Sequence, residues 1–377
     1  MLDLKRQYAP LHEELLAALD HVLKTQQFIL GEPVAIFERE AAAQLGVAHA
    51  LGCSSGTDAL WLALAEAGVG PGDAVVTTPF SFFASVSAIL RAGAKAVLAD
   101  IDPGTFNLDP AAVGRVLEGP QAGAIKAVLP VHLYGQCADW GGFQRLATEH
   151  SLKLVEDAAQ AYGAEWQGVK AGGLGDTAAF SFYPTKNLSA AGDAGMVTTN
   201  SDALAERVKM LRQHGMRRRY FHDEIGWNAR MDGFQGAILS VKLKYIDGWN
   251  GARRTAARRY HALFHAAGLA EAGPYPRNGV VLPHEAPGSR HVWHQYVIRT
   301  GRRDELRAFL AERKIGSEIY YPVPLHLQEA LKELGYKEGD FPEAERAARE
   351  VLALPIFPEI REDEQQTVVG AIGEFLG

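Results

Sequence analysis

The chain has 377 residues, of which 47% are hydrophobic and two are cysteines, and its formal net charge at pH 7 is −7. This length indicates a large domain accompanied by a smaller one. The acidic balance excludes a typical nucleic-acid-binding protein, the two cysteines exclude a disulfide framework and a metal-ligand set, and the lack of any apolar run of about 18 residues excludes a membrane span.

The N-terminal segment predicts two amphipathic helices. Residues 11–24 place apolar side chains on one helical face, namely Leu11, Leu15, Leu16, Leu19, Val22 and Leu23. Residues 34–45 form the second helix, and His49–Cys53 is a short apolar segment. Charged residues between Asp3 and Lys24 leave no signal peptide, so we expect a cytoplasmic protein without a membrane partner.

Strands and helices alternate from residue 58 to residue 156. The predicted strands are 73–78, 94–100, 125–131 and 152–156, and helices begin at about residue 58 and occupy 81–91, 110–117 and 139–150. This alternation predicts right-handed βαβ units around a mostly parallel sheet, which binds ligands at the carboxyl ends of its strands. Five residues that suit a ligand site follow three of these strands: Phe82, His132, Tyr134, Asp157 and Gln160.

The remaining chain predicts the end of the large domain and a smaller one. Predicted elements are strands at 177–182 and 195–199, helices at 202–214 and about 234–266, a proline- and glycine-rich linker at 267–290, a strand at 291–300, a helix at 302–313, a strand at 315–321, and helices near 343–352 and 362–375. We therefore expect an α/β fold with a large domain at 1–250 and a small C-terminal α/β domain at 251–377.

Lys186 lies on a turn rich in Pro, Gly, Asn and Ser between the apolar strands at 177–182 and 195–199. Burial beside such strands lowers the pKa of a lysine and frees its amine lone pair to form a Schiff base. An ordinary surface-turn lysine is the alternative interpretation.

Other residues complete a pattern around this lysine. Residues 54–57, SSGT, stand where a loop becomes a helix, so their N–H groups and hydroxyls suit a phosphate dianion, although such residues also cap helices. Asp157 ends an apolar strand, where a carboxylate either pairs with a protonated pyridine nitrogen or caps the next turn. With Phe82 to stack on a ring, the ordered set Thr57, Phe82, Asp157 and Lys186 meets the four requirements of pyridoxal phosphate.

The sequence resembles the sugar aminotransferases of the DegT/DnrJ/EryC1/StrS family, of the fold type I class. The similar stretches run from residue 2 to about residue 330: DLKRQYAPL, FILGEPVAIFERE, SSGTDAL, GVGPGDAVVTTPFSFFAS, DIDPGTFNLDP, PVHLYGQCADW, VEDAAQAYGA, GDTAAFSFYPTKNLSAAGDAGMVTTN, NARMDGFQGAIL and YPVPLHLQ. The resemblance implies a large domain like that of aspartate aminotransferase, with a mostly parallel seven-stranded sheet flanked by helices, and pyridoxal 5′-phosphate as the cofactor.

The resemblance also implies roles for the site residues. Lys186 would bind the cofactor as a Schiff base and move the catalytic proton, Asp157 would pair with the pyridine nitrogen, Gln160 would lie on one ring face, and Phe82 would stack on the other. Gly56, Thr57 and Ser181 would hold the phosphate together with Asn228 of the partner subunit. The protein would then be an obligate homodimer with two shared active sites.

A basic stretch between residues 207 and 230 is unexpected in an acidic chain. It contains Arg212, His214, Arg217, Arg218, Arg219 and Arg230. Guanidinium groups suit a diphosphate or a carboxylate, and a solvated face is the alternative. The resemblance favours a nucleotide-sugar site formed by Arg230 from the partner subunit with Tyr183, Tyr320, Tyr321 and His326.

The resemblance is greatest to enzymes that aminate C3 of a UDP- or dTDP-linked 3-keto sugar, with glutamate as amino donor. Amination at C4 is the alternative, although C4 enzymes usually open differently from DLKRQY. Relatives often read HYP where this chain has Tyr320-Tyr321-Pro322, which changes one contact to the sugar. A family dehydratase would have histidine at position 186, and a non-enzymatic regulatory binder would not retain the whole site, so both are disfavoured.

Overall fold

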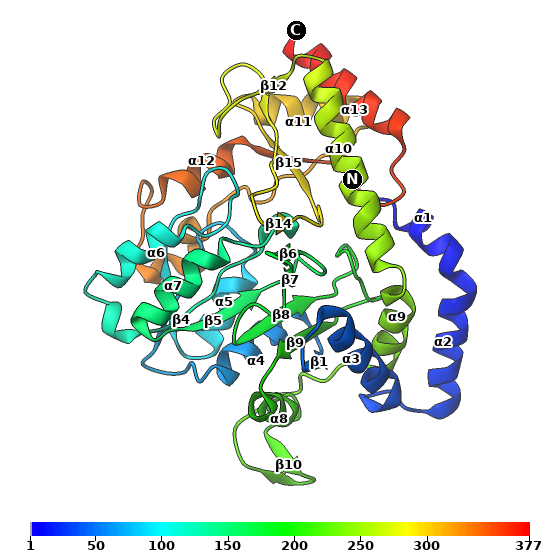
Figure 1. Ribbon diagram of the computed structural model, residues 1–377, viewed down its shortest axis with the longest axis vertical. Helices are drawn as coiled ribbons and strands as arrows, with labels where there is room; N and C mark the ends of the chain where they lie inside the picture. Colours follow the sequence, from blue (N-terminus) through cyan, green and yellow to red (C-terminus); the bar gives the residue numbers. More distant parts are fainter. Residues whose placement is uncertain (1) are drawn as a thin grey trace.

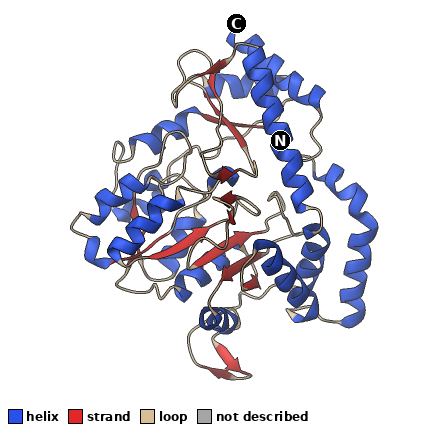
Figure 2. Ribbon diagram, viewed as in Figure 1, coloured by secondary structure: helices blue, strands red, loops and turns tan. Residues whose placement is uncertain are grey.

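The computed structural model describes residues 2–377 and has a mixed α/β architecture in which helices cover a central sheet (Figure 1, Figure 2). Seven strands form this sheet in the order β1-β9-β8-β5-β4-β2-β3. They are β1 (His49–Cys53), β2 (Ala74–Thr77), β3 (Lys95–Leu98), β4 (Ile125–Val128), β5 (Lys153–Asp157), β8 (Thr177–Ser181) and β9 (Gly195–Thr199). Within these seven strands only β9 is antiparallel to its neighbours, which confirms the predicted mostly parallel sheet.

Helices pack on both faces of the sheet because its strands are apolar on both sides. Val75 packs in the cluster that contains α4 (Gly56–Glu66), α5 (Ala84–Arg91) and α8 (Asp202–Leu211). The next residue, Val76, points to the other face and packs with α6 (Pro110–Leu117) and α7 (Trp140–His150). This double cover fixes the carboxyl ends of β2 and β5 at the edge of the sheet where the predicted site residues lie.

The N-terminal helices pack beside α9 (Figure 1). They are α2 (His12–Thr25) and α3 (Gly31–Leu45), which pack against α9 (Gly233–Leu243), and α1 (Leu4–Tyr8) precedes them in the chain. Leu15 of α2 packs with Ile238 and Val241 of α9. The predicted apolar face of α2 is wider than the observed one: Leu16 and Leu23 are 46% and 53% exposed, because α2 meets its neighbour along a narrow stripe.

The C-terminal part carries a four-stranded sheet in the order β12-β13-β15-β16. Its elements are α10 (Ile246–Ala266), β12 (Ala270–Glu271), β13 (Val280–Val281), β15 (Tyr296–Arg299), α11 (Arg303–Glu312), α12 (Pro342–Glu350), β16 (Val351–Leu354) and α13 (Glu362–Leu376). The predicted boundary at residue 250 falls inside α10, and the division of the chain there stays a prediction.

Several predicted elements differ from the structure. The helix predicted at 234–266 is two helices, α9 and α10, separated by a break at residues 244–245. The strand predicted at 315–321 is absent from the described chain, where Glu318 makes only an isolated bridge with Ala353. Residues 351–352, predicted to end a helix, instead begin β16 (Val351–Leu354), which pairs with β15 in the core. The predicted linker contributes β14 (Ser289–Arg290), which pairs with β6 (Glu165–Trp166) of the large domain.

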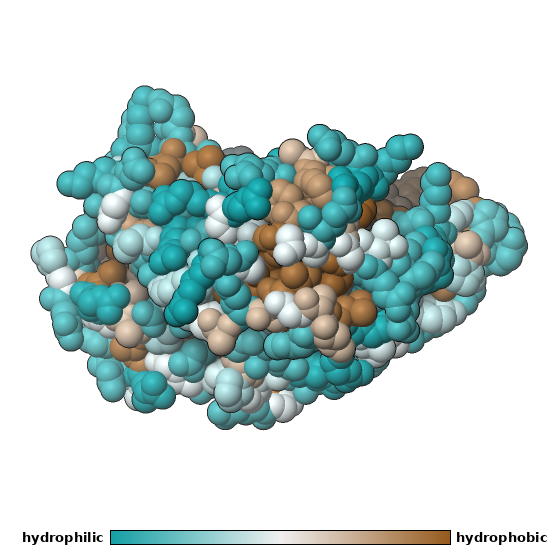
Figure 3. Space-filling model, turned by 90° about the horizontal axis from the view of Figure 1, so that it is seen from above, coloured by the Kyte–Doolittle hydropathy of each residue, from teal (hydrophilic) through white to brown (hydrophobic). Residues whose placement is uncertain are grey.

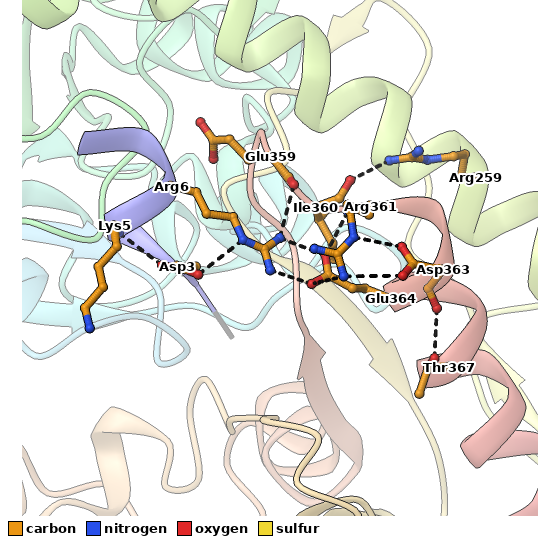
Figure 4. Close-up of polar contacts among 10 residues, drawn as sticks. All are labelled: Asp3, Lys5, Arg6, Arg259, Glu359, Ile360, Arg361, Asp363, Glu364 and Thr367. Atoms are coloured by element: carbon orange, nitrogen blue, oxygen red, sulfur yellow. Dashed lines mark hydrogen bonds and ion pairs between the residues drawn. The ribbon is translucent and has the colours of Figure 1, made fainter. Parts of the chain in front are cut away.

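A polar cluster joins α1 to α13 (Figure 4). The guanidinium of Arg6 lies 2.6 Å from Glu364 Oε1 and 3.2 Å from Asp3 Oδ2. The hydrogen bond that Glu364 accepts from Arg6 lowers the pKa of Glu364 to about 2. The first helix of the chain is therefore held against the last one.

The surface seen in Figure 3 is mostly hydrophilic, with an apolar area near its middle. Across residues 2–377 we find no helix that combines the length and the apolar character needed to span a bilayer. In the same part of the chain, no cluster of three or more His, Cys, Asp or Glu side chains is arranged to bind a metal ion.

Candidate active site

Lys186 lies on the connection between β8 and β9, two antiparallel strands whose last pair is Ser181 and Gly195. The connection turns tightly: the Lys186 N–H donates to the Tyr183 carbonyl at 2.8 Å, and the Ala190 N–H donates to the Phe182 carbonyl at 2.8 Å. Burial lowers the pKa of Lys186 to about 8, and the negative charge of Asp157 opposes this shift. Among the described residues, no carboxylate lies within ion-pair distance of the Lys186 ammonium.

Asp157 is the last residue of β5, and its carboxylate is buried. Ser85 Oγ donates to Asp157 Oδ2 at 2.7 Å, and the Ala159 N–H donates to Oδ1 at 3.2 Å. Burial raises the pKa of Asp157, while these two hydrogen bonds and the charge of Lys186 lower it. The described chain gives this carboxylate no ion-pair partner, so it can accept a cation from outside the protein.

Gln160 makes hydrogen bonds to two residues that lie far apart in the sequence. Its Oε1 accepts from the Tyr134 N–H at 2.7 Å, and its Nε2 donates to Tyr321 Oη at 3.2 Å. The Phe82 ring lies 6.4 Å from that of Tyr321 and is 60% exposed, so one of its faces is free to stack on a flat ligand. Tyr134 Oη donates to the Tyr320 carbonyl, which links the same two segments of the chain a second time.

The N-terminus of α4 forms a cradle with the ends of β8 and β9. A Cβ on Gly56 would lie 2.5 Å from Ser181 Cβ, and a Cβ on Gly195 would lie 2.2 Å from the Ser55 carbonyl oxygen, so only glycine allows these elements to meet. Ser55 caps the helix by accepting from the Asp58 N–H at 3.1 Å. The N–H groups of Gly56 and Thr57 are at the first two helical positions, where the helix itself offers no acceptor.

Residues 227–230, which we name the strap, run beside this cradle. The Ser54 N–H donates to the Ala229 carbonyl at 3.2 Å, and Arg230 is bridged to Cys53. Asn228 is exposed, and Arg230 Nε is buried with no hydrogen-bond partner in the described chain. A strap on this side of β1 lies close to the cradle of its own chain.

The predicted arginine cluster divides into two groups. Arg212 is buried, and its Nη1 lies 2.6 Å from both Glu38 Oε1 and the Gly52 carbonyl, so it belongs to the core rather than to a ligand site. Arg217 and Arg218 are exposed on the hairpin of β10 (Met216–Arg218) and β11 (Phe221–His222), which projects from the molecule (Figure 1). Arg219 is exposed on the same hairpin.

The structure does not bring all the predicted sugar-binding residues to one place. Tyr183 is exposed three residues before Lys186, and Tyr321 contacts Gln160. His326 is fully buried, and its Nε2 lies 3.0 Å from Glu345 Oε1 within the small domain, so the structure does not bring it to the other residues. His132 also leaves the site, because its ring is buried 3.0 Å from Glu156.

Two residues of the site carry no sequence motif that singled them out. Ser85, in the first turn of α5, positions the Asp157 carboxylate. His294 is buried and faces Asn187 Oδ1 at 3.1 Å, and burial together with the charge of Lys186 holds its pKa well below the usual range. The one sequence signal for Ser85 was its position shortly after β2, because the first turn of a helix that follows a strand lies near the end of that strand.

Comparison with known proteins gives full-length matches. The model of the DegT/DnrJ/EryC1/StrS aminotransferase family matches residues 10–373. A pleiotropic regulatory protein of Geobacillus stearothermophilus is 50% identical and covers 100% of this chain and 98% of its own. A dTDP-3-amino-3,4,6-trideoxy-alpha-D-glucose transaminase of Streptomyces venezuelae is 42% identical, with coverages of 99% and 95%. A UDP-N-acetyl-3-dehydro-alpha-D-glucosamine 3-aminotransferase of Acidithiobacillus ferrooxidans is 40% identical, with coverages of 100% and 97%.

Solved structures agree with these sequences. The crystal structure of DesV from S. venezuelae, in complex with a ketimine intermediate, superposes with a TM-score of 0.93 at 42% identity, covering 99% of this chain and 97% of that one. NtdA from Bacillus subtilis with bound cofactor PMP superposes with a TM-score of 0.87 at 29% identity, covering 98% and 82%. The chain is thus similar over its whole length to proteins that use a pyridoxal-type cofactor or are named for amino-sugar formation.

Proposed function

Because the chain belongs to the DegT/DnrJ/EryC1/StrS aminotransferase family, we propose that it is a transaminase that uses pyridoxal 5′-phosphate to aminate C3 of a UDP- or dTDP-linked keto sugar. The relatives at 42% and 40% identity are named for 3-amino sugars linked to dTDP and to UDP. Both nucleotides therefore stay in the proposal, and amination at C4 is not favoured.

One observation carries the proposal most directly: a lysine with a lowered pKa stands opposite a buried carboxylate that lacks a cation. The charge of Lys186 lowers the pKa of Asp157 and the charge of Asp157 raises the pKa of Lys186, yet no ion pair joins them in the described chain. A flat cation between the two would satisfy the carboxylate and leave the amine of Lys186 free.

The residues present fit pyridoxal phosphate. Asp157 would pair with the ring nitrogen, Gln160 and Phe82 would lie against the ring, and Lys186 would hold the aldehyde carbon. The cradle of Gly56, Thr57 and Ser181 has the close backbone approach and the free N–H groups that a phosphate dianion needs.

When bound, pyridoxal phosphate supplies a carbonyl carbon and an electron-withdrawing ring that stabilises negative charge next to the substrate nitrogen. Asp157 keeps its charge through the hydrogen bonds from Ser85 and Ala159, and so can hold a proton on the ring nitrogen. A pKa of about 8 leaves roughly a tenth of Lys186 neutral at pH 7, so its Nζ can accept and return a proton near neutral pH.

The finer parts of the proposal concern partners. We place Asn228 and Arg230 of the strap in the site of a partner subunit in a homodimer, with glutamate as the amino donor. The unpartnered Arg230 Nε and the exposed Asn228 support a role toward a group outside this chain. Arg217, Arg218 and Arg219 on the hairpin would meet the nucleotide diphosphate.

A half-reaction screen tests the proposal. Protein loaded with the amine form of the cofactor is offered 3-keto and 4-keto sugars linked to UDP and to dTDP, one at a time, and the amino sugar is measured by mass. We expect amine transfer to a 3-keto sugar. Transfer to 4-keto sugars alone would replace C3 by C4.

The name of the 50%-identical relative makes a regulatory binder the second candidate. Such a protein needs no lysine of lowered pKa beside a buried carboxylate, and this chain has both. A purified protein that takes up no cofactor, stays colourless and transfers no amine would favour the binder.

A further inference from the structure

Arg91 connects two parts of the site that lie far apart in the sequence. It is the last residue of α5, and its Nη1 lies 2.5 Å from Asp58 Oδ1 in the first turn of α4. Its guanidinium carbon stands 4.8 Å from the centroid of the Trp61 ring and 5.4 Å from that of the Trp227 ring. One side chain thus contacts both the cradle helix and the first residue of the strap.

Asp58 is bound closely to the cradle. Its Oδ2 accepts from the hydroxyls of Ser54 and Ser55, the latter at 3.2 Å, and its N–H donates to Ser55 Oγ. The positive end of the α4 dipole favours a carboxylate in this turn. The same carboxylate lies beside the N–H groups that would hold a phosphate dianion, and an unpaired negative charge there would repel that dianion. The guanidinium of Arg91 removes this repulsion.

Trp227 is also contacted by Trp61 and by the main chain of Leu211. Its ring meets the Trp61 ring edge to face at 6.3 Å, and the backbone N–H of Trp227 donates to the Leu211 carbonyl at 3.0 Å. Half of its surface is exposed, and its ring contacts Arg91 and Trp61 on the buried side. Asn228 and Arg230 follow within three residues, and their position depends on where Trp227 is fixed.

We infer that Arg91 is a positioning residue for the cofactor phosphate. It neutralises Asp58 beside the cradle and clamps Trp227, so that the strap presents Asn228 and Arg230 in one place. The part that concerns the phosphate rests on the proposed function, whereas the clamp on the strap does not.

Arg346 provides a matched control. It also combines an ion pair with an aromatic contact: its Nε lies 2.8 Å from Glu350 Oε1, and its guanidinium carbon stands 3.9 Å from the Tyr275 ring centroid. Its side chain is 39% exposed, against 33% for Arg91, and it belongs to α12 of the small domain. Arg346→Met therefore removes similar contacts away from the site.

The first measurement is the dissociation constant of pyridoxal phosphate, obtained by equilibrium dialysis. Loss of one ion pair and two cation–π contacts predicts an increase of about five- to tenfold in Arg91→Met. Arg91→Lys should regain part of the affinity, and Arg346→Met should bind as the wild type does. Adding Asp58→Asn to Arg91→Met should restore most of the affinity, because it removes the repelling charge. A purely structural role for Arg91 would show no such restoration.

The second measurement is hydrogen exchange of the strap amides in the protein without added cofactor. We expect faster exchange at residues 227–230 in Arg91→Met, with no change in Arg346→Met and no recovery on adding Asp58→Asn. Unchanged exchange in Arg91→Met would overturn the clamp, and Arg91→Lys serves as the test variant if the methionine variant fails to fold. A wild-type protein that binds no pyridoxal phosphate, with strap exchange increased as expected, would overturn the proposed function alone.

Discussion

At the scale of single residues, Lys186 is the group whose loss should cost most. Lys186→Ala removes the amine that we propose holds the cofactor and moves the proton, so transamination should fall by roughly three or more orders of magnitude. Cofactor in its amine form should still bind through the cradle and Asp157. Borohydride reduction of the loaded wild-type protein followed by peptide mapping should place the pyridoxyl label on Lys186, and a label on another lysine would refute the assignment.

Asp157→Asn tests the charge of the buried carboxylate. The substitution is nearly isosteric and keeps an acceptor for Ser85 Oγ, so the fold should persist, while the ring nitrogen loses its charged partner. We expect a fall in kcat of about 10²-fold or more, measured with the thermal midpoint as the check on folding. Wild-type turnover in this variant would mean that Asp157 only caps a turn.

Glu66 should control stability above neutral pH. Both of its carboxylate oxygens are buried without a hydrogen-bond partner, and burial raises its pKa to about 7, with Arg207 opposing the shift. The folded state holds the proton of Glu66 more tightly than the unfolded state does. The free-energy cost of burying the ionised carboxylate is therefore absent below the unfolded pKa near 4.5 and complete above pH 7. It amounts to at most about 3 kcal/mol.

Glu66→Gln removes this titration. The variant should be more stable than the wild type at pH 8 and close to it at pH 4.5, as measured by urea unfolding at both values. Equal pH dependence in the two proteins would show that water or movement of Glu66 relieves the burial.

Site residues that follow a strand or begin a helix could be predicted, because the topology alone brings strand ends and helix N-termini to one edge. Asp157, Gln160 and Thr57 are of this kind. Residues whose role depends on long-range packing could not: Arg212 reads as a surface arginine until Glu38 is placed 2.6 Å from it, and His326 reads as a ligand residue until Glu345 buries it.

At the scale of elements, the contact of α1 with α13 should respond to acid. The hydrogen bond with Arg6 lowers the pKa of Glu364 to about 2, so its stabilisation is present above the unfolded pKa near 4.5 and is lost as pH falls toward 2. Glu364→Gln should be modestly less stable than the wild type at pH 7 and equal to it near pH 2. Circular dichroism melts at both values measure this. A loss that persists at pH 2 would point instead to the hydrogen bond that Glu364 Oε2 accepts from the Arg361 N–H, 2.9 Å away, at the start of α13.

Element types were predictable wherever the apolar period was sustained, as for α6, which spans the predicted residues. The predictions of element type failed where one run of residues fits both the helical and the strand period. The helix predicted near 343–352 runs past the end of α12 because alanines and arginines lead directly into the apolar residues Val351–Leu354. Only pairing with Tyr296–Arg299 makes these four residues β16. Such pairing is a tertiary effect that no local window contains.

At the scale of the whole molecule, the strap decides how two subunits would share their sites. The loop before α9 stays at the ligand edge of the sheet in its own chain, since Ala229 and Arg230 lie against Ser54 and Cys53. The assignment of Asn228 and Arg230 to the partner's site stays a prediction that rests on the resemblance.

A mixed dimer of Lys186→Ala and Arg230→Ala chains tests that assignment. If the site is shared, one of its two sites carries both lesions and the other carries neither, so two inactive homodimers should regain up to half of the wild-type activity after exchange of subunits. Mass measurement confirms the exchange. No regained activity after confirmed exchange would keep Arg230 in the site of its own subunit.

The link between Arg6 and Glu364 also sets an order of events during synthesis. The two residues are 358 positions apart, so the N-terminal helix has no partner until nearly the whole chain has been translated. At about 5–20 residues per second this delay is roughly 20–70 s. The helix α1, which leaves the ribosome first, is therefore among the last elements to form its tertiary contacts.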